Sequence, residues 1–173
     1  LILISMFVGG LCGLLNGLLV SYGKIKSIIA TLGTLAIIRG AVFIVSDNVQ
    51  IDPNDVPQAI IDLSTTSPIG IPWLLIFAFI SITLVWYISS QTLLGKRIYA
   101  VGSNPEGAIS RGLSFNRITI LVFVFLGVLA GVGGVLYTAR YATINPADVG
   151  RGLEFDVISA VVIGGTNIFG GSG

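Results

Sequence analysis

The chain has 173 residues, of which 54% are hydrophobic and 10% are charged, and its formal net charge is +1 with no histidine. A soluble domain carries about 25% charged residues, so these few polar groups could not cover the surface of the chain in water. A lipid bilayer is the expected surrounding. The small net charge gives no basic field for nucleic acid, and the lack of histidine removes the commonest metal ligand and the commonest general base.

Four apolar segments reach the length of about 20 residues that crosses a hydrocarbon core of about 30 Å. They lie roughly at 1–21, 28–46, 71–90 and 118–139. A fifth apolar stretch, 157–169, is shorter and rich in glycine. It either begins a further span or forms a half-helix that enters the membrane and turns back. We expect one all-α transmembrane domain in which these segments form a polytopic helical bundle.

The basic residues predict how these spans are oriented. Loops 22–27 and 91–117 contain six of the nine Lys and Arg residues, whereas 47–70 contains four aspartates and no basic residue. Short loops with an excess of Lys and Arg face the cytoplasm. We therefore expect 22–27 and 91–117 on the cytoplasmic face, and 47–70 and about 140–156 on the outer face.

Small residues recur every fourth position in two of the spans. Gly9, Gly13 and Gly17 follow this spacing in the first span, and Gly127 and Gly131 follow it in the fourth. Residues at this spacing lie on one face of a helix and let two backbones approach closely. Glycine is common in membrane helices, but three successive glycines at this spacing predict close helix packing in a tight bundle.

Polar side chains inside the first two spans are candidates for a solute path. Arg39 lies about 10 Å from the outer end of its span at helical rise, where an arginine should face the bundle or a watery cavity. It could contact solute hydroxyls, reach the outer face or pair with a carboxylate. Asn16, Thr31 and Thr34 are further candidates, although Ser and Thr in membrane helices also often bond to backbone or to a neighbouring helix.

The loop 91–117 contains signals for a very short helix at about 103–112. Asn104 or Ser103 can cap its start, and Pro105 suits the first helical position because its missing N–H has no partner there anyway. Glu106 favours the first turn, and it also matches a capping box with Ser103.

The end of this short helix is predicted at Gly112, where a residue with positive φ belongs. Only about two turns lie between the caps, carrying Ala108 and Ile109. A helix of two turns is not stable alone in water, so it must dock. It could lie on the membrane interface, or it could fit a groove in a partner protein.

Within this loop, GKRIYAVGSNPEGAISRGLS resembles the cytoplasmic coupling loop of ribose-, galactose-, xylose- and rhamnose-type permeases of ATP-binding-cassette (ABC) importers. The segment NGLLVSYGKIKSIIATLGTLAIIRG at 16–40 and the segment LGVLAGVGGVLYTARYATINPADVGRGLEFDVISAVVIGGTNIFGGSG at 126–173 resemble other parts of this family. The resemblance covers nearly the whole chain. One departure is Gly107, where alanine is more usual, which could loosen the helix. Family members are longer at both ends, so we expect the chain to be an internal fragment.

The resemblance implies a permease subunit that moves a monosaccharide or a similar small polar solute across a bacterial cytoplasmic (inner) membrane as a multi-pass protein. It implies as partners ABC ATPase subunits, a second permease subunit, identical or different, a periplasmic or extracellular solute-binding protein, and membrane lipid, with no nucleic acid. The residues that would couple to the ATPase are Asn104, Pro105, Glu106, Ala108, Ile109, Arg111 and Gly112. ATP and Mg²⁺ would bind to the ATPase, because this chain has no G-x-x-x-x-G-K-[ST] loop. We expect no cofactor, metal or catalytic residue in this chain, which would not itself be an enzyme.

Two other functions fit a helical membrane bundle. An ATP-independent secondary transporter or channel, when ion-coupled, usually carries intramembrane acids, and the four clear spans contain none. A structural scaffold would fit the glycine-rich helices, but it leaves the capped short helix without a purpose. Glu154 and Asp156 could suggest acid–base catalysis, yet nothing else supports an enzyme, and a helix dipole explains them equally well.

Overall fold

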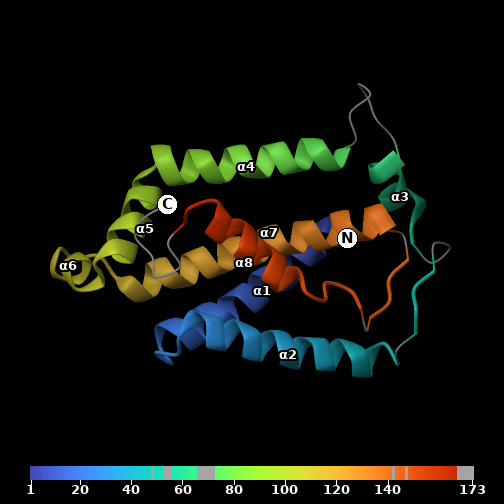
Figure 1. Ribbon diagram of the computed structural model, residues 1–173, viewed down its shortest axis with the longest axis horizontal. Coiled ribbons are helices and arrows are strands. Elements are labelled where there is room, and N and C mark those ends of the chain that lie inside the picture. The colour runs from blue at the N-terminus through green and yellow to red at the C-terminus, as the bar shows by residue number, and fades with distance from the viewer. Residues whose placement is uncertain (48, 53–55, 66–72, 142, 147, 167–173) are drawn as a thin grey trace.

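The computed structural model describes most of the chain (Figure 1), namely residues 1–47, 49–52, 56–65, 73–141, 143–146 and 148–166. These residues form eight α-helices and one isolated β-bridge, which confirms the predicted all-α class. The helices are α1 (Ile2–Ser21), α2 (Ser27–Val45), α3 (Gln58–Thr65), α4 (Trp73–Gln91), α5 (Leu93–Ser103), α6 (Pro105–Ser110), α7 (Phe115–Tyr141) and α8 (Leu153–Ile163).

Four of these helices, α1, α2, α4 and α7, are long and apolar enough to cross a membrane. α1, α2 and α4 begin and end within two residues of the segments expected from the sequence, of which residues 71 and 72 lie outside the described part. α7 has 27 residues, which is about 40 Å at helical rise and exceeds a hydrocarbon core of about 30 Å. A helix of this length crosses the apolar layer at a tilt or extends beyond it.

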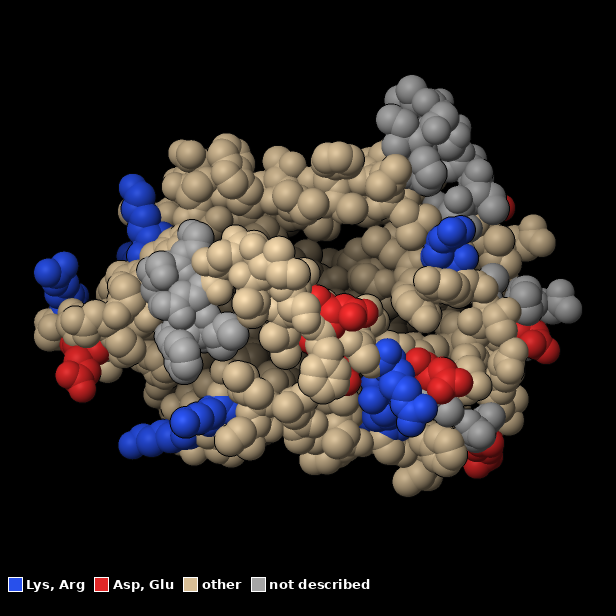
Figure 2. Space-filling model, viewed as in Figure 1, with Lys and Arg blue, Asp and Glu red and all other residues tan. Residues whose placement is uncertain are grey.

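The charged side chains separate toward the two ends of the bundle (Figure 2). The α1–α2 turn, α5, α6 and the start of α7 lie together at one end (Figure 1), and Lys and Arg gather there. Asp and Glu predominate toward the other end, near α3 and the start of α8. This distribution agrees with the orientation that the loop charges predict. The basic residues at the first end are Lys24, Lys26, Lys96, Arg97, Arg111 and Arg117.

The centre of the bundle is the crossing of α1 and α7, which touch backbone to backbone. A Cβ atom added at Gly9 would come closer than 3.0 Å to the carbonyl oxygen of Gly127, and a Cβ atom added at Gly127 would meet the carbonyl oxygen of Gly9 in the same way. Real Cβ atoms do not approach backbone atoms this closely. At this pair, only glycine on both helices permits the observed separation.

The same close approach continues along both helices. A Cβ atom at Gly13 would meet the carbonyl of Phe123, and one at Gly131 would meet the carbonyl of Ser5. The glycines expected to pack helices thus lie in the α1·α7 contact. We call this contact the glycine seam, and its glycines are Gly9, Gly13, Gly17, Gly127 and Gly131.

The seam is longer than the glycines alone predicted, because two serines continue its spacing on α1. Ser5 lies four residues before Gly9, and Ser21 lies four residues after Gly17. The backbone of Ser5 borders Gly131, and Ser21 is 5% exposed. Small residues therefore line this face of α1 over its whole length.

Two helices, α3 and α5, occupy regions for which the sequence pattern predicts loops. α3 packs against α7 and α4. α5 follows α4 after a single residue, Thr92, whose side chain accepts a hydrogen bond from the N–H of Gly95 (3.2 Å). A Cβ atom at Gly95 would come closer than 3.0 Å to the carbonyl oxygens of Ile88 and Ser89, so glycine is required where α5 turns back against α4.

The last apolar stretch forms α8, which begins four residues earlier than the predicted segment. Gly152 precedes it with φ +85°, and Glu154 and Asp156 lie in its first turn. Eleven residues span about 16 Å at helical rise, or half of a hydrocarbon core. α8 therefore has the length of a half-helix, and residues 167–169 of the predicted stretch lie outside the described residues.

Candidate functional site

The helix expected to couple to an ATPase is present as α6, and Asn104 caps its start. The Asn104 side-chain oxygen accepts a hydrogen bond from the N–H of Gly107 (2.9 Å), and Pro105 occupies the first turn. The hydroxyl of Ser103 instead donates to the carbonyl of Tyr99 (2.9 Å) within α5. Of the two candidate caps, Asn104 is therefore the one used, and the capping box that Ser103 and Glu106 suggested is not formed.

The end of α6 has the geometry that the sequence predicted. Gly112 adopts φ +82°, which a residue with a Cβ atom tolerates poorly. Its N–H donates to the carbonyl of Ile109 (2.9 Å), and the N–H of Leu113 donates to the carbonyl of Ala108 (3.0 Å). These two bonds form a Schellman motif that satisfies the last carbonyls of the helix.

α6 has one inward and one outward face. Ala108 is 4% exposed, and α6 contacts α5 and α7. Ile109 is 58% exposed, and Glu106 and Arg111 are also exposed. Glu106 and Ile109 are three residues apart and therefore neighbours on the helix surface. The outermost tip of the molecule (Figure 1) thus presents an apolar side chain beside a carboxylate.

The four residues considered for a solute path fall into two separate places. Thr34 donates a hydrogen bond to the side-chain oxygen of Asn16 (2.7 Å) and so joins α2 to α1. Thr31, one turn earlier, donates to the carbonyl of Ser27 in its own helix (2.9 Å). Arg39 is elsewhere, because its guanidinium donates to the carbonyl of Gly150 (3.3 Å).

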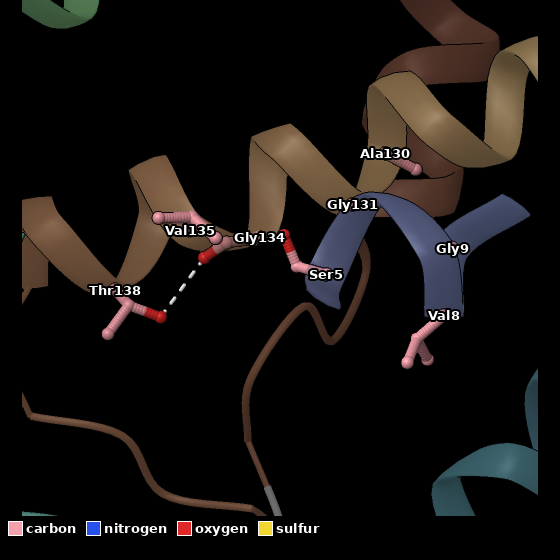
Figure 3. Close-up of a pocket in the computed structure, with 8 residues that line it drawn as sticks. All are labelled: Ser5, Val8, Gly9, Ala130, Gly131, Gly134, Val135 and Thr138. Atoms are coloured by element: carbon pink, nitrogen blue, oxygen red, sulfur yellow. Dashed lines mark hydrogen bonds between the residues drawn. The ribbon is translucent and has the colours of Figure 1, made fainter. Parts of the chain in front are cut away.

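A surface groove of about 440 Å³ lies beside the outer half of the glycine seam (Figure 3). None of the four path residues lines it. The two hydroxyl groups in the groove are bonded to their own helices, since Ser5 donates to Ile2 (2.9 Å) and Thr138 donates to Gly134 (3.0 Å). The groove is therefore lined by small side chains and is mainly apolar, so it is not a polar binding site. Its lining residues are Ser5, Val8, Gly9, Ala130, Gly131, Gly134, Val135 and Thr138.

The acidic residues before and within α8 do not form a catalytic arrangement. Arg151 pairs with Asp148 (3.5 Å) on the exposed surface, and Glu154 and Asp156 lie where the helix dipole favours negative charge. Among the described residues, no group of three His, Cys, Asp or Glu side chains could hold a metal ion.

Several residues that shape the fold were not predicted from the sequence. Thr92 and Gly95 set the corner between α4 and α5. The helical spacing of Leu94, Ile98 and Val101 after a capping threonine could have predicted α5. The bond between Arg39 and Gly150 joins positions 111 residues apart, and no local pattern indicates it.

Comparison with known proteins assigns the fold to a family. The family described as "Branched-chain amino acid transport system / permease component" matches residues 1–171. The chain belongs to this permease family. With four helices that could cross a membrane, it is a multi-pass membrane protein.

Named relatives give a more detailed picture. The chain is 37% identical to the D-allose transport system permease protein of Escherichia coli (strain K12), over 98% of this chain and 51% of the relative. It is 33% identical to the ribose import permease protein of Haemophilus influenzae, over 98% and 53%. It is 34% identical to the autoinducer 2 import system permease protein of Photorhabdus luminescens, over 99% and 51%. The chain spans about half the length of the curated relatives it matches. No solved structure matches the chain.

The resemblance to permeases of carbohydrate-type ABC importers, which the sequence blocks suggested, is confirmed at the level of the family.

Proposed function

We propose that this protein is the permease subunit of an ABC importer for a monosaccharide or a similar small polar solute, with α6 as the helix that couples it to a separate ATPase. The observation that carries the proposal is the exposed, doubly capped α6 at the basic end of a chain from this permease family.

The build of α6 suits docking in a groove of another protein. Six residues are too few for a helix that is stable alone, yet its start and its end are both fixed by hydrogen bonds. Fully burying an isoleucine side chain is worth about 1.5–3 kcal/mol. Ile109 is therefore the anchor of the proposed contact, and Glu106 and Arg111 are its polar surroundings.

The connections of α6 allow a motion at its tip to reach two membrane spans. α5 joins α6 to α4 through the close contact at Gly95, and a few residues after Gly112 lead directly into α7. A partner that moves α6 would therefore displace the inner ends of α4 and α7 together.

The proposal includes the partners and cofactors that importers of this kind use. ABC ATPase subunits bind ATP together with Mg²⁺ and hydrolyse the ATP, and this chain binds no cofactor. A second permease subunit, identical or different, completes the path, and a solute-binding protein delivers the solute from outside. Asn16, Thr31 and Thr34 are the polar residues proposed for the path between α1 and α2.

The names of the relatives support the solute class. D-allose and ribose are monosaccharides, and the permease proteins that carry these names are about one-third identical to this chain. We therefore propose a solute with several hydroxyl groups and no net charge.

Site-directed cross-linking in the assembled transporter tests the coupling role of α6. Ile109→Cys and Glu106→Cys place a thiol on the outward face, and the matched control Ala108→Cys places one on the inward face. We expect cross-links to the ATPase from positions 106 and 109 and none from 108. Absence of cross-links from all three positions would rule out α6 as the coupling helix. Uptake that survives ATP depletion but stops with an uncoupler would establish an ATP-independent transporter instead.

A further inference from the structure

Arg39 is an arginine inside a membrane-spanning helix, and its hydrogen-bond partner is a backbone carbonyl in a distant segment. It lies six residues before the end of α2 and is partly buried. Its guanidinium donates to the carbonyl of Gly150 (3.3 Å). Among the described residues, no carboxylate lies within ion-pair distance of it. A charged side chain inside the membrane raises the free energy of the folded protein. Such residues therefore pair with other groups, including backbone carbonyls, and are usually functional.

The carbonyl that Arg39 holds is at the entry to α8. Gly150 (φ +66°) and Gly152 (φ +85°) both adopt left-handed conformations and turn the chain into the helix. The same Gly150 carbonyl accepts a hydrogen bond from the N–H of Leu153 (3.4 Å), the first residue of α8. Arg39 therefore acts on the group at which α8 begins.

A second connection joins the same two parts of the chain. Ile51, which follows α2, and Ile144, which follows α7, exchange two backbone hydrogen bonds of 2.9 and 3.1 Å. Between these two connections, the N–H of Val149 donates to the carbonyl of Asn145 (3.0 Å). We call residues 143–146 and 148–152 the entry segment. It is bound to the α2 side at both of its ends.

Within the described part of the chain, little else fixes the position of α8. It has no buried residue, and it makes no substantial packing contact with another described helix. A short helix with exposed sides is placed by what holds its ends. In the described residues, the entry segment is what fixes the N-terminal end of α8.

We propose that Arg39 is a positioning residue, which fixes the entry segment to α2 and so makes α2 and the start of α8 move as one unit on the outer side of the transporter. In this role Arg39 acts through the Gly150 carbonyl and does not contact the solute. This inference depends on the proposed importer function only where uptake is measured.

The test uses the full-length permease, free of cysteine, in the assembled transporter in membranes. Ile51→Cys and Ile144→Cys are introduced together and linked by a short bifunctional thiosulfonate reagent, which a reductant reverses. Opposite residues of an antiparallel pair with mutual hydrogen bonds have Cα atoms about 5.5 Å apart, within reach of such a reagent. The link is formed in the Arg39 parent and in Arg39→Ala and Arg39→Lys.

We expect Arg39→Ala to slow formation of the link several-fold and to lower uptake roughly threefold, the factor that an average hydrogen bond between membrane helices is worth. Arg39→Lys should retain part of the uptake, because an ammonium can still donate to one carbonyl. Once formed, the link should restore uptake in Arg39→Ala, and the reductant should abolish the rescue. The linked parent should keep its uptake.

Two results would overturn the proposal. A link that forms in Arg39→Ala as fast as in the parent would show that Arg39 does not hold the entry segment. A complete link that leaves the uptake of Arg39→Ala low would show that Arg39 acts on the solute itself. The rate of linking needs no transport, so a parent whose uptake proves independent of ATP would refute the proposed importer function while leaving this test intact.

Discussion

The glycine seam and the α5–α6 arm are held together by opposite means. In the seam, two long helices touch through their backbones because side chains are missing at the contact. In the arm, two short helices are fixed by caps, by the corner at Gly95 and by limited packing on α7. We therefore expect α1 and α7 to form a rigid frame, because sliding would break their close backbone contacts. We expect the α5–α6 arm to act as a lever that a bound partner can displace relative to this frame.

The largest effect should come from adding a single methyl group in the seam. Gly127→Ala forces the backbone of α1 away from α7, and overpacking of this kind costs about 1–3 kcal/mol. Gly133→Ala is the matched control on the same helix, because a Cβ atom there meets nothing within 4 Å. Thermal unfolding in detergent should show a lower Tm for Gly127→Ala and an equal or higher Tm for Gly133→Ala, since alanine favours a helix over glycine by up to about 1 kcal/mol. Equal Tm values would contradict the seam.

The next effect should come from the corner that joins the lever to the frame. Gly95→Ala would drive a methyl group into the carbonyls of Ile88 and Ser89 and so change the direction of α5. We expect ATP-driven uptake to fall strongly while the membrane still contains the protein in normal amounts. A fall in protein amount equal to the fall in uptake would indicate a folding defect instead. Gly33→Ala, at an open position in α2, is the control and should leave uptake unchanged.

A smaller effect is expected at the cap of α6. Asn104→Ala removes the acceptor for the Gly107 N–H, and loss of an N-cap typically costs about 1 kcal/mol. Asn104→Asp keeps an acceptor at that place and is the control. Amide hydrogen exchange over residues 106–110 should be faster in Asn104→Ala and close to the parent rate in Asn104→Asp. Equal exchange in all three proteins would show that the cap does not stabilise α6.

The smallest effect concerns the bond between Asn16 and Thr34, which joins α2 to the frame. Hydrogen bonds between membrane helices average about 0.6 kcal/mol in double-mutant cycles. Asn16→Ala, Thr34→Val and the double variant should therefore show a coupling free energy of this size in unfolding experiments. If both residues also contact the solute, the single variants will raise the KM for uptake, whereas a purely structural bond will leave the KM unchanged.

Much of the fold could be predicted because its signals are local. Runs of about 20 apolar residues indicate the four long helices, and the spacing of Gly9, Gly13 and Gly17 indicates the face that packs. The caps of α6 follow from residue types whose backbone preferences are strong, namely Asn104, Pro105 and Gly112. These features depend on neighbours within a few positions.

The features that were missed depend on distant or weak signals. α3 has eight residues and α5 has eleven, so their periodicity is short and lies within polar loops. The bond from Arg39 to Gly150 and the pairing of Ile51 with Ile144 involve backbone groups, which every residue type possesses. No residue pattern can therefore indicate these partners, and only the folded chain brings them together.

The central claim is that α6 holds an ATPase through its outward face, and co-purification of the full-length permease with its ATPase tests it most directly. The variant Glu106→Gln with Ile109→Ala removes the carboxylate and the exposed apolar anchor. The matched control, Asp47→Asn with Ile44→Ala, makes the same kinds of change at the opposite end of the molecule, where Ile44 is also exposed. We predict that the first variant loses the ATPase and that the control retains it. Full retention of the ATPase by the Glu106 and Ile109 variant would contradict the account.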